Sequence, residues 1–72
     1  MRNVQEIAIL IKTELKSKKI TATEMLLDLG LNRSTLVDMK NGSMPSADKL
    51  GKIAQYLELS TDYLLGLVDK KR

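Results

Sequence analysis

The sequence predicts an all-α protein, a compact bundle of five short helices around one aliphatic core. Apolar residues recur three and four positions apart along the chain, which is the spacing of a helix face. The alternation of apolar and polar residues that marks a half-buried strand is absent, and the 72 residues include neither Phe nor Trp. Capping residues and glycines divide the chain into five segments. The length indicates a single domain.

The first helix is expected from Val4 to Ser17. Its apolar stripe follows the helical spacing and consists of Val4, Ile7, Ala8, Ile11 and Leu15. Lys16, Lys18 and Lys19 lie at its end, where cations are favourable beside the negative end of the helix dipole. This basic stretch is either a solvated helix end or an edge that contacts phosphate, and the two roles are compatible.

The second helix is expected to begin at Thr21 and to end at Leu29. Thr21 and Glu24 have the spacing of a reciprocal capping box, in which each side chain accepts from the other residue's backbone N–H. Gly30 follows the helix and can adopt the left-handed conformation that ends one without a Cβ penalty.

The third helix is expected from about Asn32 to Lys40, with Asn32 as its N-cap. Leu36 and Met39 lie three residues apart and face the core, and Asn41-Gly42 is the stop signal. Leu31 is expected to fill the corner between the second and third helices. These two helices joined at a glycine form a helix-turn-helix.

The fourth helix is expected from about Ala47 to Glu58. Pro45 excludes helix at the residue before it, and Ser46 is a plausible N-cap. A short fifth helix follows the cap Ser60, and Gly66 limits its length. Its apolar face is expected to consist of Tyr63, Leu64, Leu67 and Val68. We expect one domain over residues 1–68 and a basic, flexible tail over residues 69–72.

Composition excludes several classes of function. The chain contains no Cys and no His, so thiol nucleophiles, imidazole bases, zinc fingers and disulfides are all excluded. No apolar run reaches the ~20 residues that a membrane span needs, and no signal-peptide pattern follows Met1. A cytoplasmic protein without metal, cofactor or small-molecule ligand is expected. Twelve Lys and Arg against nine Asp and Glu give a net charge of +3, a mild preference for polyanions.

In order and spacing, four motifs resemble the lambda-repressor-like helix-turn-helix domains of phage repressors, Cro proteins and their bacterial relatives, the XRE family. They are Ile20-Thr21-Ala22-Thr23-Glu24-Met25, Leu29-Gly30-Leu31-Asn32-Arg33-Ser34-Thr35-Leu36, Lys40-Asn41-Gly42 followed by Pro45-Ser46, and Leu57-Glu58-Leu59-Ser60-Thr61-Asp62-Tyr63-Leu64-Leu65-Gly66. The resemblance covers nearly the whole chain. It implies a five-helix, sequence-specific DNA-binding domain that works as a dimer on a roughly palindromic operator in bacterial or phage transcription control.

Three residues depart from the pattern of this family. Ala22 stands where relatives commonly have a Gln that holds a DNA phosphate, so that contact is missing or supplied elsewhere. Leu26 stands where a small residue lets the two motif helices pack closely, which implies a wider crossing or a compensating gap. Leu27 occupies a position that is usually polar, as an ordinary exposed leucine or as part of a partner surface.

With Leu36 and Met39 inward, the outward side chains of the third helix are expected to contact bases in the major groove. They are Arg33, Ser34, Val37 and Asp38. Arg33 is the leading candidate because a guanidinium donates two bonds to guanine, with phosphate contact or plain solvation as the alternatives. Val37 is either in contact with a thymine methyl or peripheral core. Asp38 either accepts from cytosine N4 or orients a neighbouring cation.

Residues around the helix-turn-helix are expected to contact phosphates. The candidates are Thr23, Asn32, Lys40, Asn41, Ser43, Lys18 and Lys19, and the alternative role of the two asparagines is capping alone. From Thr21 to Met44 the chain has two cations and three carboxylates, a net charge of −1, so Lys18, Lys19, Lys40 or the basic tail are expected to supply part of the affinity for DNA.

Dimerisation is expected near the C-terminus, through Leu59, Tyr63, Leu67 and Val68, unless these residues simply close the core around the fifth helix. The leading functional hypothesis is a DNA-binding transcriptional regulator, a compact repressor or Cro-like protein. The alternative is a protein-interaction module of the same fold, such as an antitoxin or a phage accessory factor. An enzyme is not expected, because the carboxylates Glu24, Asp28 and Asp38 have the spacing of ordinary surface charges.

Overall fold

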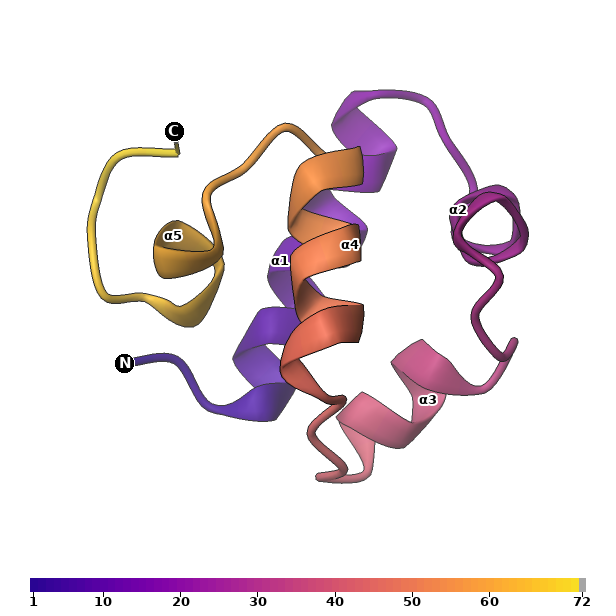
Figure 1. Ribbon diagram of the computed structural model, residues 1–72, viewed down its shortest axis with the longest axis horizontal. Helices are drawn as coiled ribbons and strands as arrows, with labels where there is room; N and C mark the ends of the chain where they lie inside the picture. The colour runs from indigo at the N-terminus through magenta and orange to yellow at the C-terminus, as the bar shows by residue number, and fades with distance from the viewer. Residues whose placement is uncertain (72) are drawn as a thin grey trace.

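A computed structural model describes residues 1–71 of the chain. It contains five α-helices among these residues, and the predicted all-α fold is confirmed (Figure 1). They are α1 (Val4–Ser17), α2 (Ala22–Leu29), α3 (Thr35–Lys40), α4 (Ala47–Tyr56) and α5 (Thr61–Leu65). Helix α1 packs against α3 and α5, and α4 packs against α2 and α5. In Figure 1, α2 and α3 lie on one side of the molecule, and α5 lies on the other side with both ends of the chain.

The core is aliphatic and receives side chains from every helix. Its buried hydrophobic members are Ile7, Ala8, Ile11, Leu15, Met25, Leu26, Leu36, Met39, Leu50, Ile53, Ala54, Leu57, Leu59 and Leu64. The inward positions predicted for the first and third helices are therefore confirmed, except that Val4 is only half-buried. Burial of this surface is the main force that holds five short helices together.

The capping box lies at a different helix from the one we expected. Asn3 and Glu6 form it at the start of α1: the Asn3 side chain accepts from Glu6 N at 2.8 Å, and Glu6 Oε1 accepts from Asn3 N at 3.0 Å. At α2, Thr21 Oγ1 accepts from Glu24 N at 3.1 Å, but Glu24 returns no bond within the described part of the chain. Thr21 is thus an N-cap as predicted, but the prediction of a reciprocal bond from Thr21 N to the Glu24 side chain was wrong.

The start of α3 also differs from the prediction. Asn32 does not cap this helix, which begins at Thr35 with Ser34 as N-cap, so Arg33 and Ser34 lie in the preceding turn. The Asn32 carbonyl oxygen accepts from Thr35 Oγ1 at 2.7 Å and from Thr35 N at 3.1 Å. Thr35 is buried, and a buried hydroxyl needs an acceptor. This bond gives Asn32 a role through its backbone.

Helix α4 ends two residues before the predicted boundary. Leu57 is its C-cap, Glu58 adopts the left-handed conformation with φ +58°, and Leu59 N donates to Ala54 O at 2.8 Å. The tight turn lets the chain bury both Leu57 and Leu59. A regular helix to Glu58 would not direct both side chains into the core.

Helix α5 begins as predicted and contains fewer apolar residues than predicted. Ser60 Oγ accepts from Tyr63 N at 3.0 Å, and Gly66 ends the helix with φ +82°. Leu67 and Val68 follow the helix and are 57% and 43% exposed. The prediction that they belong to its apolar face was therefore wrong.

The C-terminal segment returns to the body of the protein. Lys71 O accepts from Ser60 N at 2.5 Å, and Lys71 Nζ lies 3.2 Å from a carboxylate oxygen of Glu14. Arg72, the last residue of the expected flexible tail, lies outside the described residues. Within residues 1–71, no helix is long and apolar enough to cross a bilayer, and no group of acidic side chains is arranged to hold a metal ion.

Candidate nucleic-acid interface

Helices α2 and α3 meet at the turn formed by Gly30 and Leu31. Gly30 has φ +68°, and Leu31 N donates to Leu26 O at 2.8 Å, which closes the end of α2. Leu31 is half-buried against the core at the corner where it was expected. In Figure 1, α2 is seen end-on while α3 runs across the view, so the two helices cross steeply.

Leu26 and Leu27, two departures from the family pattern, have opposite environments. Leu26 is buried in the core, at 3% exposed, whereas Leu27 is 63% exposed on α2. The larger side chain at position 26 is accommodated in the core, and the expected solvent-facing position of Leu27 is confirmed.

The outer side of α3 and the turn before it form one exposed surface, here called the recognition face. It consists of Arg33, Ser34, Val37 and Asp38, all of them exposed. Val37 is 56% exposed, so its alternative role as peripheral core is wrong. Leu36 and Met39, on the opposite side of α3, are buried and fix the orientation of the recognition face.

Ser34 and Asp38 are coupled within this face. Ser34 Oγ donates to Asp38 Oδ2 at 3.2 Å, a contact that the sequence analysis did not anticipate. Within residues 1–71, Asp38 forms no ion pair with a cation, and neither does Arg33. The carboxylate is therefore restrained by a neutral hydroxyl, and the Arg33 guanidinium remains available for an external acceptor.

A polar hollow of about 170 Å³ lies beside the recognition face. It brings together three of the predicted residues, Asn32, Asp38 and Ser43, with Lys49 from the first turn of α4. Ser46, the N-cap of α4, makes no side-chain capping bond within the described residues, and the carboxylate of Asp48 in the first turn already complements the positive end of this helix. Lys49 was not among the predicted site residues, although its position three residues after the cap Ser46 was visible in the sequence.

The other predicted phosphate contacts are divided between two regions. Asn41 and Lys40 are exposed at the end of α3, and Thr23 is exposed in the first turn of α2. Lys18 and Lys19 lie in the turn between α1 and α2, which Figure 1 shows at the opposite end of the view from α3. Lys18 Nζ is also 3.9 Å from a Glu58 carboxylate oxygen. The structure therefore does not bring these two lysines together with α3.

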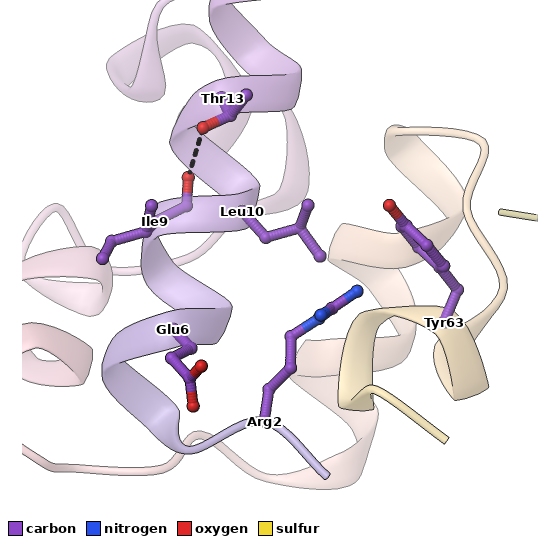
Figure 2. A pocket seen from close by; sticks show the side chains of 6 residues that line it. All are labelled: Arg2, Glu6, Ile9, Leu10, Thr13 and Tyr63. Atoms are coloured by element: carbon purple, nitrogen blue, oxygen red, sulfur yellow. Dashed lines mark hydrogen bonds between the residues drawn. The ribbon is translucent and has the colours of Figure 1, made fainter. Parts of the chain in front are cut away.

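A second hollow, of about 420 Å³, lies between α1 and α5 and is shown in Figure 2. The Arg2 side chain extends into it, with its guanidinium carbon 5.1 Å from the centre of the Tyr63 ring. Arg2 N donates to Leu65 O at 2.8 Å, and Arg2 Nε is buried without an acceptor within the described chain. The hollow contains an arginine–aromatic contact that joins the N-terminal arm to α5.

The four residues expected at a dimer interface have different environments. Leu59 is buried in the core and offers no surface, which corresponds to the alternative role considered for it. Tyr63 is half-buried beneath Arg2. Only Leu67 and Val68 are exposed. Dimerisation remains a prediction, with these two as the residues that a second copy could contact.

Comparison with known proteins gives two matches. The family described as "Helix-turn-helix domain" matches residues 8–70. The "ImmF control region 10 kDa protein" of Bacillus phage phi105 is 35% identical over 65 residues, which is 89% of this chain and 72% of the phage protein. No solved structure gives a significant match.

Proposed function

The chain belongs to the helix-turn-helix domain family, whose members are DNA-binding and not enzymatic, and from this premise we propose that it is a sequence-specific transcriptional regulator. The observation that carries the proposal is the recognition face: Leu36 and Met39 anchor one side of α3 in the core, and the turn before the helix presents Arg33 without an ion-pair partner within residues 1–71. A major groove admits one helix in this orientation, with the preceding helix against the backbone.

Base reading is assigned to the recognition face. Arg33 donates to O6 and N7 of a guanine, a pairing that discriminates by about 1 to 3 kcal/mol. Val37 contacts a thymine methyl, which its exposure supports. Asp38, hydrogen-bonded to Ser34, accepts from a cytosine amino group. Its negative charge repels phosphate, so it disfavours binding modes that place the DNA backbone against the recognition face.

Phosphate contacts are assigned to residues in and around the helix-turn-helix. Thr23 lies at the start of α2, and Asn32 and Ser43 line the polar hollow with Lys49. Lys40 and Asn41 lie at the end of α3. Such contacts fix the register of the protein on DNA and carry no sequence information directly. Lys18 and Lys19, at the far end of α1, contribute to the general attraction of DNA.

The phage relative supports a role in gene control, because it is described as a protein of a control region. We propose a repressor or Cro-like protein that acts in the cytoplasm as a homodimer on an approximately palindromic operator. Two copies related by a two-fold axis would place their recognition helices in half-sites about one helical turn apart.

Selection of random-sequence duplexes by the purified protein, followed by sequencing of the bound pool, tests this function. The wild-type protein should select a palindrome with half-sites roughly 10 base pairs apart. Arg33→Ala should lose the preference for one guanine position and bind the selected site roughly 5- to 150-fold more weakly, the equivalent of about 1 to 3 kcal/mol. Lys70→Ala is the charge-matched control, because residue 70 lies in the C-terminal segment, across the molecule from α2 and α3 (Figure 1). If Arg33→Ala and Lys70→Ala behaved alike, the assignment of base reading to Arg33 on the recognition face would be wrong.

A second candidate function is a protein-interaction module such as an antitoxin or accessory factor. The observation that favours it is the 63% exposure of Leu27 on α2, the first helix of the motif, which gives an apolar contact that DNA does not need. Weak, salt-sensitive binding without sequence preference would support this alternative and count against the regulator.

A further inference from the structure

The hollow between α1 and α5 has apolar walls that remain accessible to a partner. Its lining comes from one edge of α1, from α5 and from the N-terminal arm (Figure 2). Leu10 and Tyr63 are half-buried and pack against the core, so they form its inner surface. Ile9 is aliphatic and yet 61% exposed at its rim. The volume of about 420 Å³ lies within the range of known ligand sites, roughly 300 to 1,000 Å³.

The α1 edge of this hollow is elongated. Glu6, Ile9 and Thr13 are three and four residues apart, so they lie on the same side of the helix. From Glu6 to Thr13 the edge extends over about 10 Å, at a rise of about 1.5 Å per residue. A surface of this shape offers contacts to several successive side chains, which suits a peptide segment.

The Arg2 side chain is held in the hollow by three contacts with α5 and the residue after it. Arg2 N donates to Leu65 O at 2.8 Å, and the guanidinium carbon lies 5.1 Å from the centre of the Tyr63 ring. Arg2 Cγ lies only 2.7 Å from the position that a Cβ on Gly66 would occupy, so the glycine makes room for the arginine stem. Because the guanidinium is placed in advance, a partner would pay little conformational entropy to meet it.

The charge of this arginine is not balanced by a carboxylate of the described chain. Arg2 forms no ion pair within residues 1–71, and its Nε is buried there without an acceptor. Glu6 also lines the hollow, but its Oε1 accepts from Asn3 N at 3.0 Å. Lys16, three residues after Thr13, adds a second cation to this side of α1. The hollow therefore favours a carboxylate, whose two oxygens match the guanidinium fork.

We propose that this hollow docks a short segment of another protein in which an apolar side chain lies beside an Asp or Glu. The apolar side chain packs between Ile9 and Tyr63, and the carboxylate accepts from the terminal Nη groups of Arg2, because Nε is covered. This activity is separate from DNA binding, since α5 lies across the molecule from α2 and α3 (Figure 1). It is also separate from the exposed Leu27, which lies on α2.

Selection from a display library of short random peptides on the purified wild-type protein tests the proposal. Enriched peptides should share an aliphatic or aromatic residue within a few positions of an Asp or Glu. A synthetic copy, followed by fluorescence anisotropy, should bind Arg2→Gln roughly 10- to 150-fold more weakly, as expected for the loss of a hydrogen bond between charged groups. Replacing the acidic residue of the peptide by its amide should weaken binding to a similar extent and should abolish the effect of Arg2→Gln.

Two matched variants separate the hollow from other apolar surface. Ile9→Ser should weaken peptide binding roughly tenfold, because it removes one apolar wall. Leu27→Ser changes a residue of nearly equal exposure, 63% against 61%, and should leave peptide binding unchanged. Since Arg2 also joins the N-terminal arm to α5, Ile9→Ser tests the hollow without disturbing that contact.

Three results would refute the proposal. The first is that no peptide is enriched, or that the enriched peptides lack a carboxylate. The second is that a peptide binds Ile9→Ser as tightly as the wild-type protein, or loses affinity on Leu27→Ser instead. The third is self-association of the wild-type protein in sedimentation that Ile9→Ser abolishes, because a second copy would then occupy the hollow. These outcomes do not depend on whether the protein selects a DNA site.

Discussion

Gly66 is the position where substitution by alanine should destabilise the protein most among its glycines. It has φ +82°, a conformation that costs a residue with a Cβ about 1 to 2 kcal/mol. A Cβ at this position would lie 2.7 Å from Arg2 Cγ and 2.8 Å from Arg2 N. The backbone of Arg2 would have to move, which weakens its hydrogen bond to Leu65 O and its contact with Tyr63. The combined loss is roughly 2 to 4 kcal/mol.

Gly30 and Gly51 are matched controls for this substitution. Gly30 has φ +68° but nothing within 4 Å of a new Cβ, so Gly30→Ala should cost only the conformational part, about 1 to 2 kcal/mol. Gly51 lies inside α4 with no neighbour within 4 Å, so Gly51→Ala should stabilise the protein by about 0.5 to 1 kcal/mol.

Urea unfolding followed by circular dichroism at 222 nm measures these differences in the free energy of unfolding. A chain of 72 residues has a total stability of about 4 to 11 kcal/mol, so Gly66→Ala should lower the midpoint markedly. A loss at Gly66 no greater than that at Gly30 would refute the reasoning, because it would mean that Arg2 does not pack tightly against α5.

Two further predictions concern contacts between distant parts of the chain. Tyr56 OH donates to Asp28 Oδ2 at 2.7 Å, and this hydrogen bond, followed by desolvation, raises the pKa of Tyr56. The stabilising contribution of this hydrogen bond is present below the ordinary tyrosine pKa and is lost as pH rises through the raised pKa of Tyr56. Asp28→Asn should lower the Tyr56 midpoint in an NMR titration. An unchanged midpoint would contradict the hydrogen bond to Asp28 as the cause of the raised pKa. Lys71→Ala should remove the ion pair with Glu14 and cost less than about 1 kcal/mol in urea unfolding, with a smaller difference in 1 M NaCl; a loss independent of salt would contradict an electrostatic origin.

Local signals in the sequence predicted the helix boundaries well where a cap or a glycine acts alone. Gly30 and Gly66 end α2 and α5 in the left-handed conformation, and Thr21 and Ser60 cap their starts. Each of these effects depends on residues within one helical turn, so the sequence contains the information needed.

The prediction failed where burial competes with local capping. Asparagine is a residue type favoured at N-caps, yet α3 does not begin after Asn32. The buried Thr35 hydroxyl donates to the Asn32 carbonyl oxygen, and the helix begins at Thr35. The burial of Leu57 and Leu59 ends α4 early in the same way. Such choices depend on tertiary packing, which overrides weak local preferences.

In the candidate site too, features set by local sequence pattern were predicted, and features set by tertiary packing were not. The exposure of Val37 and Asp38 followed from helical periodicity around Leu36 and Met39, whereas Arg33 and Ser34 are exposed in the turn before α3. The polar hollow, by contrast, brings Asn32 and Asp38 together with Lys49 of α4, and no spacing in the sequence indicates that these residues meet. The basic residues Lys18 and Lys19 were included because they are cations near the motif in sequence, although they lie far from α3 in space (Figure 1).

Helix α3 has six residues, fewer than two turns, and an isolated helix of this length does not form in water. The recognition face therefore forms only when the whole domain is folded. DNA binding and global unfolding then become a single linked equilibrium, in which bound DNA stabilises the fold and each loss of core packing reduces the concentration of protein that can bind DNA. Warming the protein towards its melting temperature would reduce the occupancy of a DNA site without altering any residue that contacts it, so DNA binding by such a domain is inherently sensitive to temperature.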